Sequence, residues 1–336
     1  MTGLPDHQEG DVRARVPLGR RGAVTVSRVG FGTAPLGGLF TAVADDTAAA
    51  TLAAAWDAGI RYFDTAPHYG LGAAERRLGA FVSGLGPAAR GEAVVSTKVG
   101  RLLEPGVTEP GTDAFADGAS VVRSRDYTRE GIYRSLADSL ERSGLDAFDI
   151  LLIHDPDDHW TESLEQAYPA LARLRDEGAV RAIGVGMNQT GMLGRFVTET
   201  DVDCVMVAGR YSLLDRDAAH ELFPLCRRRG VGVLVAGVFN SGVLADPRPG
   251  AHYDYSPAPG PMLRRARWMA GRCAAHGVPL TAAALRFPLR HPAVTGIVVG
   301  ARTPGEIIED LALAATEIPA GLWEELDQEA AEAGSA

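Results

Sequence analysis

Three short apolar runs each end in a titratable side chain: Asp64, Lys98 and His154. Burying a charge costs several kcal/mol unless it is paired, so we expect Asp64 and Lys98 to pair with each other. A purely structural ion pair is the alternative, but it leaves His154 unexplained. Tyr69 follows Asp64 on a loop, where the Lys98 ammonium is expected to lower its pKa from about 10 toward the working range. A phenol with a lowered pKa is a general acid or base, so the pattern predicts a proton-transfer site.

Lysine is unusually rare in this chain. Lys98 is the only lysine, and the other 32 of the 33 basic residues are arginine. Chance or codon bias with a single survivor is one explanation. The other is that this position needs a compact, titratable ammonium, which a guanidinium cannot imitate. The neighbouring titratable groups favour the second explanation.

The run from His154 to Trp160 is rich in His and Asp and resembles a metal-binding cluster. Ligands on consecutive loop residues cannot all converge on one ion, and no His-x-x-Glu or His-x-His spacing supports a site. We therefore expect no metal here. His159 and Trp160 are instead expected at the rim of the pocket.

The elements that position these residues alternate between short β-rich runs and helical patterns. Strands are predicted at 29–32, 61–64, 93–98, 149–154, 182–186, 204–208, 231–238 and 294–300, and helices at 46–58, 74–82, 128–143, 161–177, 191–200, 217–229, 261–276 and 304–314. This alternation predicts a parallel (β/α)₈ TIM barrel, with the candidate residues at the C-terminal ends of its strands, where barrel active sites lie. A doubly wound sheet is the runner-up, because alternation does not show closure. The stretch 30–35 lacks the last glycine of a dinucleotide fingerprint, so a Rossmann fold is rejected.

The remaining segments complete the predicted architecture. Residues 1–12 are polar and patternless and are predicted to be a disordered arm, with 13–336 forming a single barrel domain. Residues 16–26 carry an N-terminal β-hairpin signal, and Pro319–Ala333 predicts an extra C-terminal helix outside the barrel. The long segments 100–126 and 240–260 both follow strands, so in a barrel both overhang its mouth.

Composition excludes several classes of protein. The chain has 336 residues, 46% of them hydrophobic and 23% charged, as in a folded globular protein. A net charge of −10 argues against nucleic-acid binding, which needs excess Lys and Arg. We find no signal peptide and no apolar stretch long enough to span a membrane. The 3 cysteines lie far apart without a Cys-x-x-Cys pair, as expected for a cytoplasmic protein. Either a monomer or a homodimer is compatible with the sequence.

Three motifs carry a resemblance to a known family. Asp64-Thr65-Ala66-x-x-Tyr69-Gly70, Ser96-Thr97-Lys98 and Leu151-Leu152-Ile153-His154 resemble the catalytic tetrad motifs of the aldo-keto reductases. The resemblance extends from Val26 to about Ala314. It implies hydride transfer between a nicotinamide cofactor and a carbonyl or alcohol. Tyr69 would be the acid or base, Lys98 its pKa partner, Asp64 the partner of Lys98, and His154 the group that orients the substrate.

The resemblance also implies a set of cofactor contacts, with departures from the common family pattern. Gly186 stands where serine is usual, so the amide contact is expected from Asn188. Ala208 and Ala236 replace a usual glutamine and a stacking aromatic residue. The residues expected to contact the cofactor are Thr33, Asn188, Phe239, Asn240, Ser241, Gly242, Gly300, Ala301, Arg302, Glu306 and Asp310.

The choice between NAD and NADP depends on two charges near residue 300. Glu306 would repel a 2′-phosphate and accept hydrogen bonds from a free ribose hydroxyl. Arg302 acts in the opposite direction, because its guanidinium can bind that phosphate. On balance NAD is favoured over NADP. The alternative interpretation makes Glu306 an ordinary N-terminal helix acid, favoured by the helix dipole.

Further motifs resemble the branch of the family that includes L-fucose and D-threo-aldose 1-dehydrogenases and pyridoxal 4-dehydrogenase. They lie at 66–70, 98–101, 154–157, 184–189, 236–242 and 251–255. This branch implies oxidation of a cyclic hemiacetal to a lactone, with ionised Tyr69 removing the anomeric hydroxyl proton. The side chains expected near the substrate, a small sugar or aldehyde, are His68, Trp160, Tyr211 and Tyr253.

Two alternatives to this function stay open. One is a carbonyl reductase of a biosynthetic pathway that uses the same site in the opposite direction. The other is a non-catalytic, cofactor-sensing subunit, which is less expected because Tyr69, Lys98 and His154 are all present.

Overall fold

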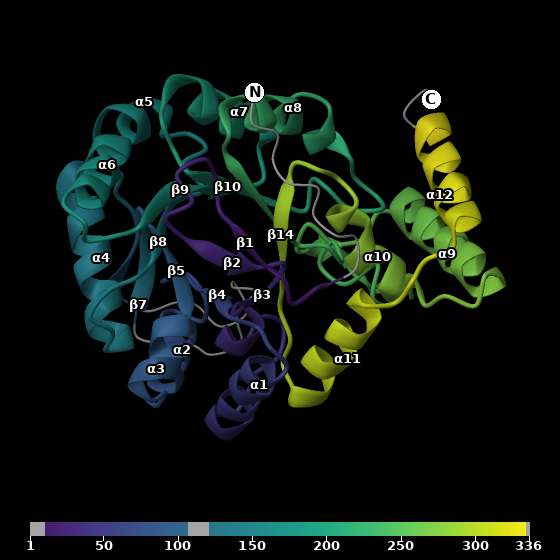
Figure 1. Ribbon diagram of the computed structural model, residues 1–336, viewed down its shortest axis with the longest axis horizontal. Coiled ribbons are helices and arrows are strands. Elements are labelled where there is room, and N and C mark those ends of the chain that lie inside the picture. The colour runs from purple at the N-terminus through teal and green to yellow at the C-terminus, as the bar shows by residue number, and fades with distance from the viewer. Residues whose placement is uncertain (1–10, 107–120, 334–336) are drawn as a thin grey trace.

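The computed structural model describes residues 11–106 and 121–333. Within these residues, eight parallel strands form a closed barrel surrounded by helices (Figure 1). In order around the barrel they are β3 (Val29–Gly32), β4 (Tyr62–Asp64), β5 (Val94–Val99), β8 (Ile150–His154), β9 (Ala182–Met187), β10 (Cys204–Ala208), β11 (Gly232–Ala236) and β14 (Val294–Val299). Pairing of β14 with β3 closes the ring. The predicted (β/α)₈ barrel is confirmed, and the doubly wound sheet is excluded.

The helices follow most of the predicted pattern, with several differences, among them the short helix Pro87–Glu92, which was not predicted. They are α1 (Asp45–Asp57), α2 (Ala73–Ser83), α3 (Pro87–Glu92), α4 (Arg129–Ser143), α5 (Trp160–Glu162), α6 (Tyr168–Asp176), α7 (Thr190–Glu199), α8 (Leu222–Arg229), α9 (Gly260–Ala275), α10 (Leu280–Leu289), α11 (Pro304–Ala314) and α12 (Ala320–Ala333). A π-helical turn, Ser163–Ala167, interrupts the predicted helix 161–177. Helix α10 was not predicted, because most of its residues are buried and it lacks the polar face that marks an amphipathic helix.

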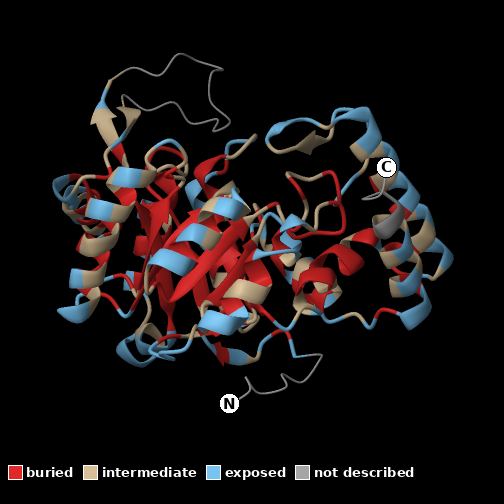
Figure 2. Cartoon of the chain, turned by 90° about the horizontal axis from the view of Figure 1, so that it is seen from above, coloured by how far each residue is buried: buried red, intermediate tan, exposed pale blue. Residues whose placement is uncertain are grey.

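Alternation along the strands decides which side chains enter the barrel. Tyr62, Val94 and Leu152 belong to the cluster that fills the barrel interior, whereas Val95 packs in the outer core. The same alternation places Asp64, Lys98 and His154 on the inner face, at the C-terminal ends of β4, β5 and β8. Figure 2 shows the barrel strands as buried and the outer faces of the helices as exposed.

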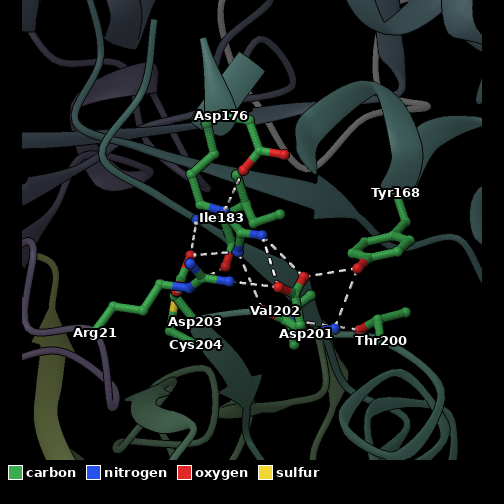
Figure 3. Close-up of polar contacts among 10 residues, drawn as sticks. Arg21, Tyr168, Asp176, Ile183, Thr200, Asp201, Val202, Asp203 and Cys204 are labelled. Atoms are coloured by element: carbon green, nitrogen blue, oxygen red, sulfur yellow. Dashed lines mark hydrogen bonds and ion pairs between the residues drawn. The ribbon is translucent and has the colours of Figure 1, made fainter. Parts of the chain in front are cut away.

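The opposite end of the barrel is closed by the hairpin β1 (Arg15–Pro17) and β2 (Thr25–Ser27). An ion-pair network fixes its turn to the barrel floor (Figure 3). Arg21 Nε lies 3.0 Å from Asp203 Oδ1, and Arg175 Nη1 lies 3.0 Å from Asp203 Oδ2. Arg175 Nη2 also donates to both oxygens of Asp201. Because this network lies just before β10, it supports the floor and not the mouth.

Two boundaries differ from the expectation. Val12 is buried, and its carbonyl accepts a hydrogen bond from Val29 N, so the predicted disordered arm 1–12 is wrong at its C-terminal end. Residues 1–10 lie outside the described residues. The segment 100–126 was expected to be a loop, but it contains the antiparallel hairpin β6 (Arg101–Pro105) and β7 (Val121–Arg125). This hairpin follows β5 and lies beside the candidate site.

The second long segment, 240–260, contains the short antiparallel pair β12 (His252–Tyr253) and β13 (Ser256–Pro257). His252 stacks on Phe40, with ring centroids 4.8 Å apart, so the loop after β11 contacts the loop after β3. None of the helices in the described parts of the chain is both long enough and apolar enough to span a membrane.

Candidate active site

A buried lysine is the centre of the site. Lys98 Nζ donates to Asp64 Oδ2 at 2.6 Å, to Tyr69 Oη at 3.0 Å and to the Thr65 carbonyl at 3.1 Å. The Lys98 and Asp64 side chains are only 2% and 3% exposed. All three ammonium protons therefore have acceptors, and the predicted pairing of Asp64 with Lys98 is present in the structure.

Further hydrogen bonds hold Asp64 in place. Ser96 Oγ donates to Asp64 Oδ1 at 2.7 Å, and Tyr62 Oη lies 3.0 Å from Ser96 Oγ. Thr33, which was expected to contact the cofactor, donates its hydroxyl to the Asp64 carbonyl at 3.0 Å. Sequence reasoning missed the roles of Ser96 and Tyr62, although strand alternation places both on the inner face. Asp64 is thus held through both carboxylate oxygens and through its backbone.

The turn after β4 fixes Tyr69. Gly70 has a φ of 59°, and a Cβ atom there would lie 2.1 Å from the carbonyl oxygen of Gly37. Gly37 belongs to the 3-10 helix Pro35–Gly37, so the two loops touch through their backbones. Only glycine fits this approach, because the left-handed conformation and the lack of space both exclude a side chain. The contact holds the Tyr69 turn against its neighbour.

Electrostatics give Tyr69 and Lys98 their protonation states. Burial raises the pKa of Tyr69, Lys98 lowers it and Asp64 raises it, which brings it to about 12. Lys98 lowers the pKa of Tyr69, as predicted. The predicted net lowering of this pKa is wrong, because the effect of burial is larger than that of the ammonium. Burial lowers the pKa of Lys98, but Asp64 and Tyr69 outweigh it, so this pKa is raised. At neutral pH the site therefore holds a neutral phenol beside an ammonium.

His154 faces the same space from β8. Its ring centroid lies 6.1 Å from that of Tyr69, and the rings are nearly perpendicular at 84°. Burial, followed by the charges of Arg101 and Lys98, holds the pKa of His154 well below its usual range, so the imidazole is neutral. Tyr127 Oη donates to the His154 carbonyl at 2.6 Å and fixes the end of the strand. A neutral imidazole here can donate one hydrogen bond to a substrate oxygen.

The inserted hairpin supplies a further side chain to the site. Arg101 Nη2 donates to Asp155 Oδ2 at 2.7 Å, and Nη1 lies 3.4 Å from His68 Nδ1. Asp155 Oδ2 lies 3.5 Å from His154 Nε2. Burial and the Arg101 charge lower the pKa of His68 to about 2. Of these residues, only His68 and His154 were expected at the site. One signal in the sequence could have indicated Asp155, because it directly follows His154 at the end of a predicted strand.

Two residues expected near the substrate, Trp160 and Tyr211, pack against aromatic residues of the core. The Trp160 ring packs against Phe196, with centroids 4.8 Å apart, and under the Arg195 guanidinium at 3.7 Å. Tyr211 is buried, and its ring centroid lies 4.7 Å from that of Phe223. Trp160 begins the short helix α5 and Tyr211 lies on the loop after β10, so strand periodicity does not predict where either side chain points. The structure thus places these rings in packing contacts.

Tyr253 lies on the half-exposed strand β12, and its hydroxyl donates to Asp215 Oδ2 at 3.3 Å. The neighbouring Asp254 forms a two-pronged ion pair with Arg210, at 2.7 and 3.0 Å. These contacts fix the loop after β11 to the loop after β10. Tyr253 therefore lies within a loop-fixing cluster at the edge of the barrel mouth.

The loop after β11 holds four of the expected cofactor residues. Phe239 and Gly242 are half-buried, whereas Asn240 is buried and accepts a hydrogen bond from Ser212 Oγ. Asn240 Nδ2 donates to the Gly209 carbonyl at 3.1 Å. The hydroxyl of Ser241 accepts a hydrogen bond from the Tyr255 backbone. Within the loop, Asn240 N donates to the Gly237 carbonyl and Gly242 N donates to the Phe239 carbonyl, so both side-chain and backbone hydrogen bonds shape it.

The expected adenosine end lies at the start of α11. Glu306 Oε2 accepts a hydrogen bond from Arg302 N at 2.7 Å, and Thr303 Oγ1 accepts one from Glu306 N at 3.3 Å. Glu306 therefore has the capping role of the alternative interpretation. Arg302 Nη2 donates to the Leu39 carbonyl, and its buried Nε has no hydrogen-bond partner among the described residues.

The other expected cofactor residues lie at strand ends or on α11. Asn188 directly follows β9, and Gly300 and Ala301 directly follow β14. Asp310 is on α11, where burial and the charges of Glu306 and Glu309 raise its pKa to about 7. Within the described residues, no group of three or more His, Cys, Asp or Glu side chains is arranged to hold a metal ion.

A family model and several known enzymes are similar to this chain over most of its length. The model of the Aldo/keto reductase family matches residues 28–330. D-threo-aldose 1-dehydrogenase of a Pseudomonas species is 46% identical, over 92% of this chain and 96% of that protein. Pyridoxal 4-dehydrogenase of Microbacterium luteolum is 39% identical, over 93% and 96%. L-Galactose dehydrogenase of Arabidopsis thaliana is 31% identical, over 90% and 88%.

A solved structure supports the same fold. The glycerol dehydrogenase of Gluconobacter oxydans superposes with a TM-score of 0.72 at 23% identity, covering 94% of each chain. At that identity the likeness concerns the barrel alone. The family match covers most of the chain, and the three relatives all share more than 30% of their residues with it. The chain therefore belongs to the aldo/keto reductase family and is a nicotinamide-dependent oxidoreductase.

Proposed function

We propose that the protein is an NAD-dependent aldose 1-dehydrogenase that oxidises a cyclic sugar hemiacetal to its lactone. The observation that carries the proposal is the buried Asp64–Lys98–Tyr69 chain of hydrogen bonds beside a neutral His154. The 46% identity to a D-threo-aldose 1-dehydrogenase supports the sugar substrate and the direction. Cofactor choice, substrate and residue roles are parts of the proposal.

In the proposed mechanism, Tyr69 is the base. Its phenolate removes the proton of the anomeric hydroxyl, and the electron pair of that O–H bond becomes the new C=O bond. The C1–H electron pair leaves with the hydrogen as hydride. Lys98 stabilises the phenolate through the 3.0 Å hydrogen bond, and Asp64 balances the Lys98 charge. His154 donates to the reacting oxygen and orients it. A nicotinamide cofactor, when bound, supplies the hydride acceptor.

The described residues fit such a cofactor. The buried Nε of Arg302 lacks a hydrogen-bond partner within residues 11–106 and 121–333, and it lies beside the N-terminus of α11, which favours anions. Arg302, Gly300 and the backbone of the loop at Ser241 would hold its phosphates. Asp310 would contact the adenosine end. The Glu306 carboxylate would oppose a 2′-phosphate at the same end.

The expected cofactor preference is NAD over NADP, measured as the ratio of the two kcat/KM values at low salt. Replacing Glu306 with glutamine removes the charge that opposes the 2′-phosphate. We expect Glu306→Gln to shift the ratio toward NADP by about fivefold. The matched control is Glu317→Gln, which removes an exposed charge beyond α11 and should leave the ratio unchanged. An equal shift in both variants would contradict a local role of Glu306.

Sugar oxidation is expected to become faster as the pH rises. The phenolate of Tyr69 is the reactive form, and its pKa of about 12 leaves the phenol largely protonated at neutral pH. Below this pKa each pH unit increases the phenolate fraction up to tenfold. The measurement is the initial rate at subsaturating sugar from pH 6 to 9, with protein stability checked at each pH. A rate that is flat over this range would contradict Tyr69 as the base.

A carbonyl reductase is the second candidate, because the same raised pKa keeps the Tyr69 phenol protonated at neutral pH, and this protonated form is the one that a general acid needs. The deciding experiment follows reduced-nicotinamide absorbance with purified protein. L-Fucose, L-galactose, D-arabinose and pyridoxal are tested with NAD and NADP, and a panel of carbonyl compounds is tested with NADH and NADPH. Turnover of an aldose supports the dehydrogenase. Turnover of carbonyl compounds alone would support the reductase.

A further inference from the structure

An ion pair that the tetrad does not use lies beside the catalytic histidine. Arg101 reaches from β6 to Asp155, and the two side chains are 15% and 24% exposed. Asp155 has a φ of 42°, a left-handed conformation that is uncommon for residues other than glycine. Asp155 N donates to the Gly186 carbonyl, and the Asp155 carbonyl shares the Tyr127 hydroxyl proton with the His154 carbonyl. Strained residues of this kind cluster at ligand-binding positions.

The pair has unused hydrogen-bonding capacity. Asp155 Oδ2 accepts from Arg101, whereas Asp155 Oδ1 has no hydrogen-bond partner among the described residues. The buried Nε of Arg101 likewise has none in the described part of the chain. Arg101 Nη1 approaches His68, so one guanidinium connects Asp155 with a residue already expected near the substrate. A carboxylate and a guanidinium with spare capacity are the groups that bind a hydroxyl as acceptor and donor.

We propose that Arg101 and Asp155 form a recognition site for the substrate hydroxyl on the carbon next to the reacting carbon. The inference rests on the proposed function, in which His154 holds the oxygen of the reacting carbon. Asp155 Oδ2 lies 3.5 Å from His154 Nε2, so the two groups can contact neighbouring atoms of one small substrate. An oxygen bound to His154 therefore brings its neighbouring hydroxyl within reach of Asp155. Aldehydes without that hydroxyl lose this contact.

The inserted hairpin gives the recognition site its position. Arg101 is the first residue of β6, directly after the turn that ends β5. The hairpin is also fixed from outside, where Glu104 forms an ion pair with Arg134 of α4. This second pair contacts none of the four tetrad residues, so it provides a matched control for loosening the hairpin.

The test compares L-fucose with 2-deoxy-L-fucose as substrates of the wild type and of Asp155→Asn, Arg101→Met and Arg134→Met. A site built around a substrate hydroxyl discriminates against the analogue that lacks it. We expect Asp155→Asn and Arg101→Met to lower kcat/KM for L-fucose by about 10- to 100-fold, the effect of one hydrogen bond to a charged group. For the deoxy sugar the expected loss is below about threefold. Arg134→Met should preserve the wild-type ratio of kcat/KM for L-fucose to kcat/KM for 2-deoxy-L-fucose.

Equal losses for both sugars would overturn the proposal, because the pair would then act only on His154. The proposal would also be overturned if Arg134→Met lowered the ratio of kcat/KM for L-fucose to kcat/KM for 2-deoxy-L-fucose as strongly as the site variants do. The same comparison in the reductive direction uses glycolaldehyde and acetaldehyde. If the wild type oxidises no sugar but these variants selectively lose glycolaldehyde reduction, the proposed function fails and the recognition site stands.

Discussion

Replacing Tyr69 with phenylalanine is expected to lower kcat for sugar oxidation by about 10²- to 10⁴-fold, the range of general acid–base catalysis. The variant loses one oxygen atom, the one that accepts the 3.0 Å hydrogen bond from Lys98. The ring keeps its place, because the backbone contact between Gly70 and Gly37 fixes the turn. The loss should therefore appear in kcat, with little change in the affinity for cofactor.

Two measurements separate this chemical effect from a structural one. Cofactor affinity, followed by quenching of protein fluorescence, should agree within about twofold between Tyr69→Phe and the wild type, a difference of a few tenths of a kcal/mol. Tyr133→Phe is the matched control, because Tyr133 packs on α4 at the outer core, away from the tetrad. Its kcat should equal that of the wild type. If Tyr69→Phe kept kcat within threefold of wild type, another group would be the base.

The tetrad was predictable because strand alternation is a strong constraint. Each of Asp64, Lys98 and His154 ends a run that the structure shows as a barrel strand, so their convergence followed from the closure of the barrel. The helices were predicted wherever polar and apolar residues alternate with helical period. Helix α10 was missed for lack of that contrast, since it is buried on most sides.

Side chains on loops were not predictable in this way. Trp160 and Tyr211 lie beyond the ends of their strands, where alternation no longer applies, and the structure shows both rings in packing contacts. Arg101 was missed because the hairpin β6–β7 lies in a segment whose glycines, prolines and acids indicated a loop. The direction of the Tyr69 pKa shift was also missed, because it depends on the depth of burial. Sequence patterns specify which face of a strand a residue occupies, but not what surrounds a loop residue.

The second large effect is expected when Lys98 is replaced with methionine. Asp64, 3% exposed, then lies buried without a countercharge. Breaking a buried ion pair in this way lowers the free energy of unfolding by about 3–5 kcal/mol. The variant should also be inactive, because the Tyr69 phenolate loses its partner. The measurements are urea unfolding and kcat, and a stability equal to that of the wild type would contradict the importance of the pair.

A double variant separates the two contributions of Lys98. In Asp64→Asn/Lys98→Met neither charge remains, so much of the lost stability should return. Activity should not return, because Tyr69 still lacks the ammonium. Lys98→Arg makes the complementary test, since it keeps the positive charge. A planar guanidinium cannot direct donors at once to the Asp64 carboxylate, the Tyr69 hydroxyl and the Thr65 carbonyl, which are the three acceptors of Lys98 Nζ. We therefore expect Lys98→Arg to be inactive, which would explain why lysine survives at this one position of an arginine-rich chain.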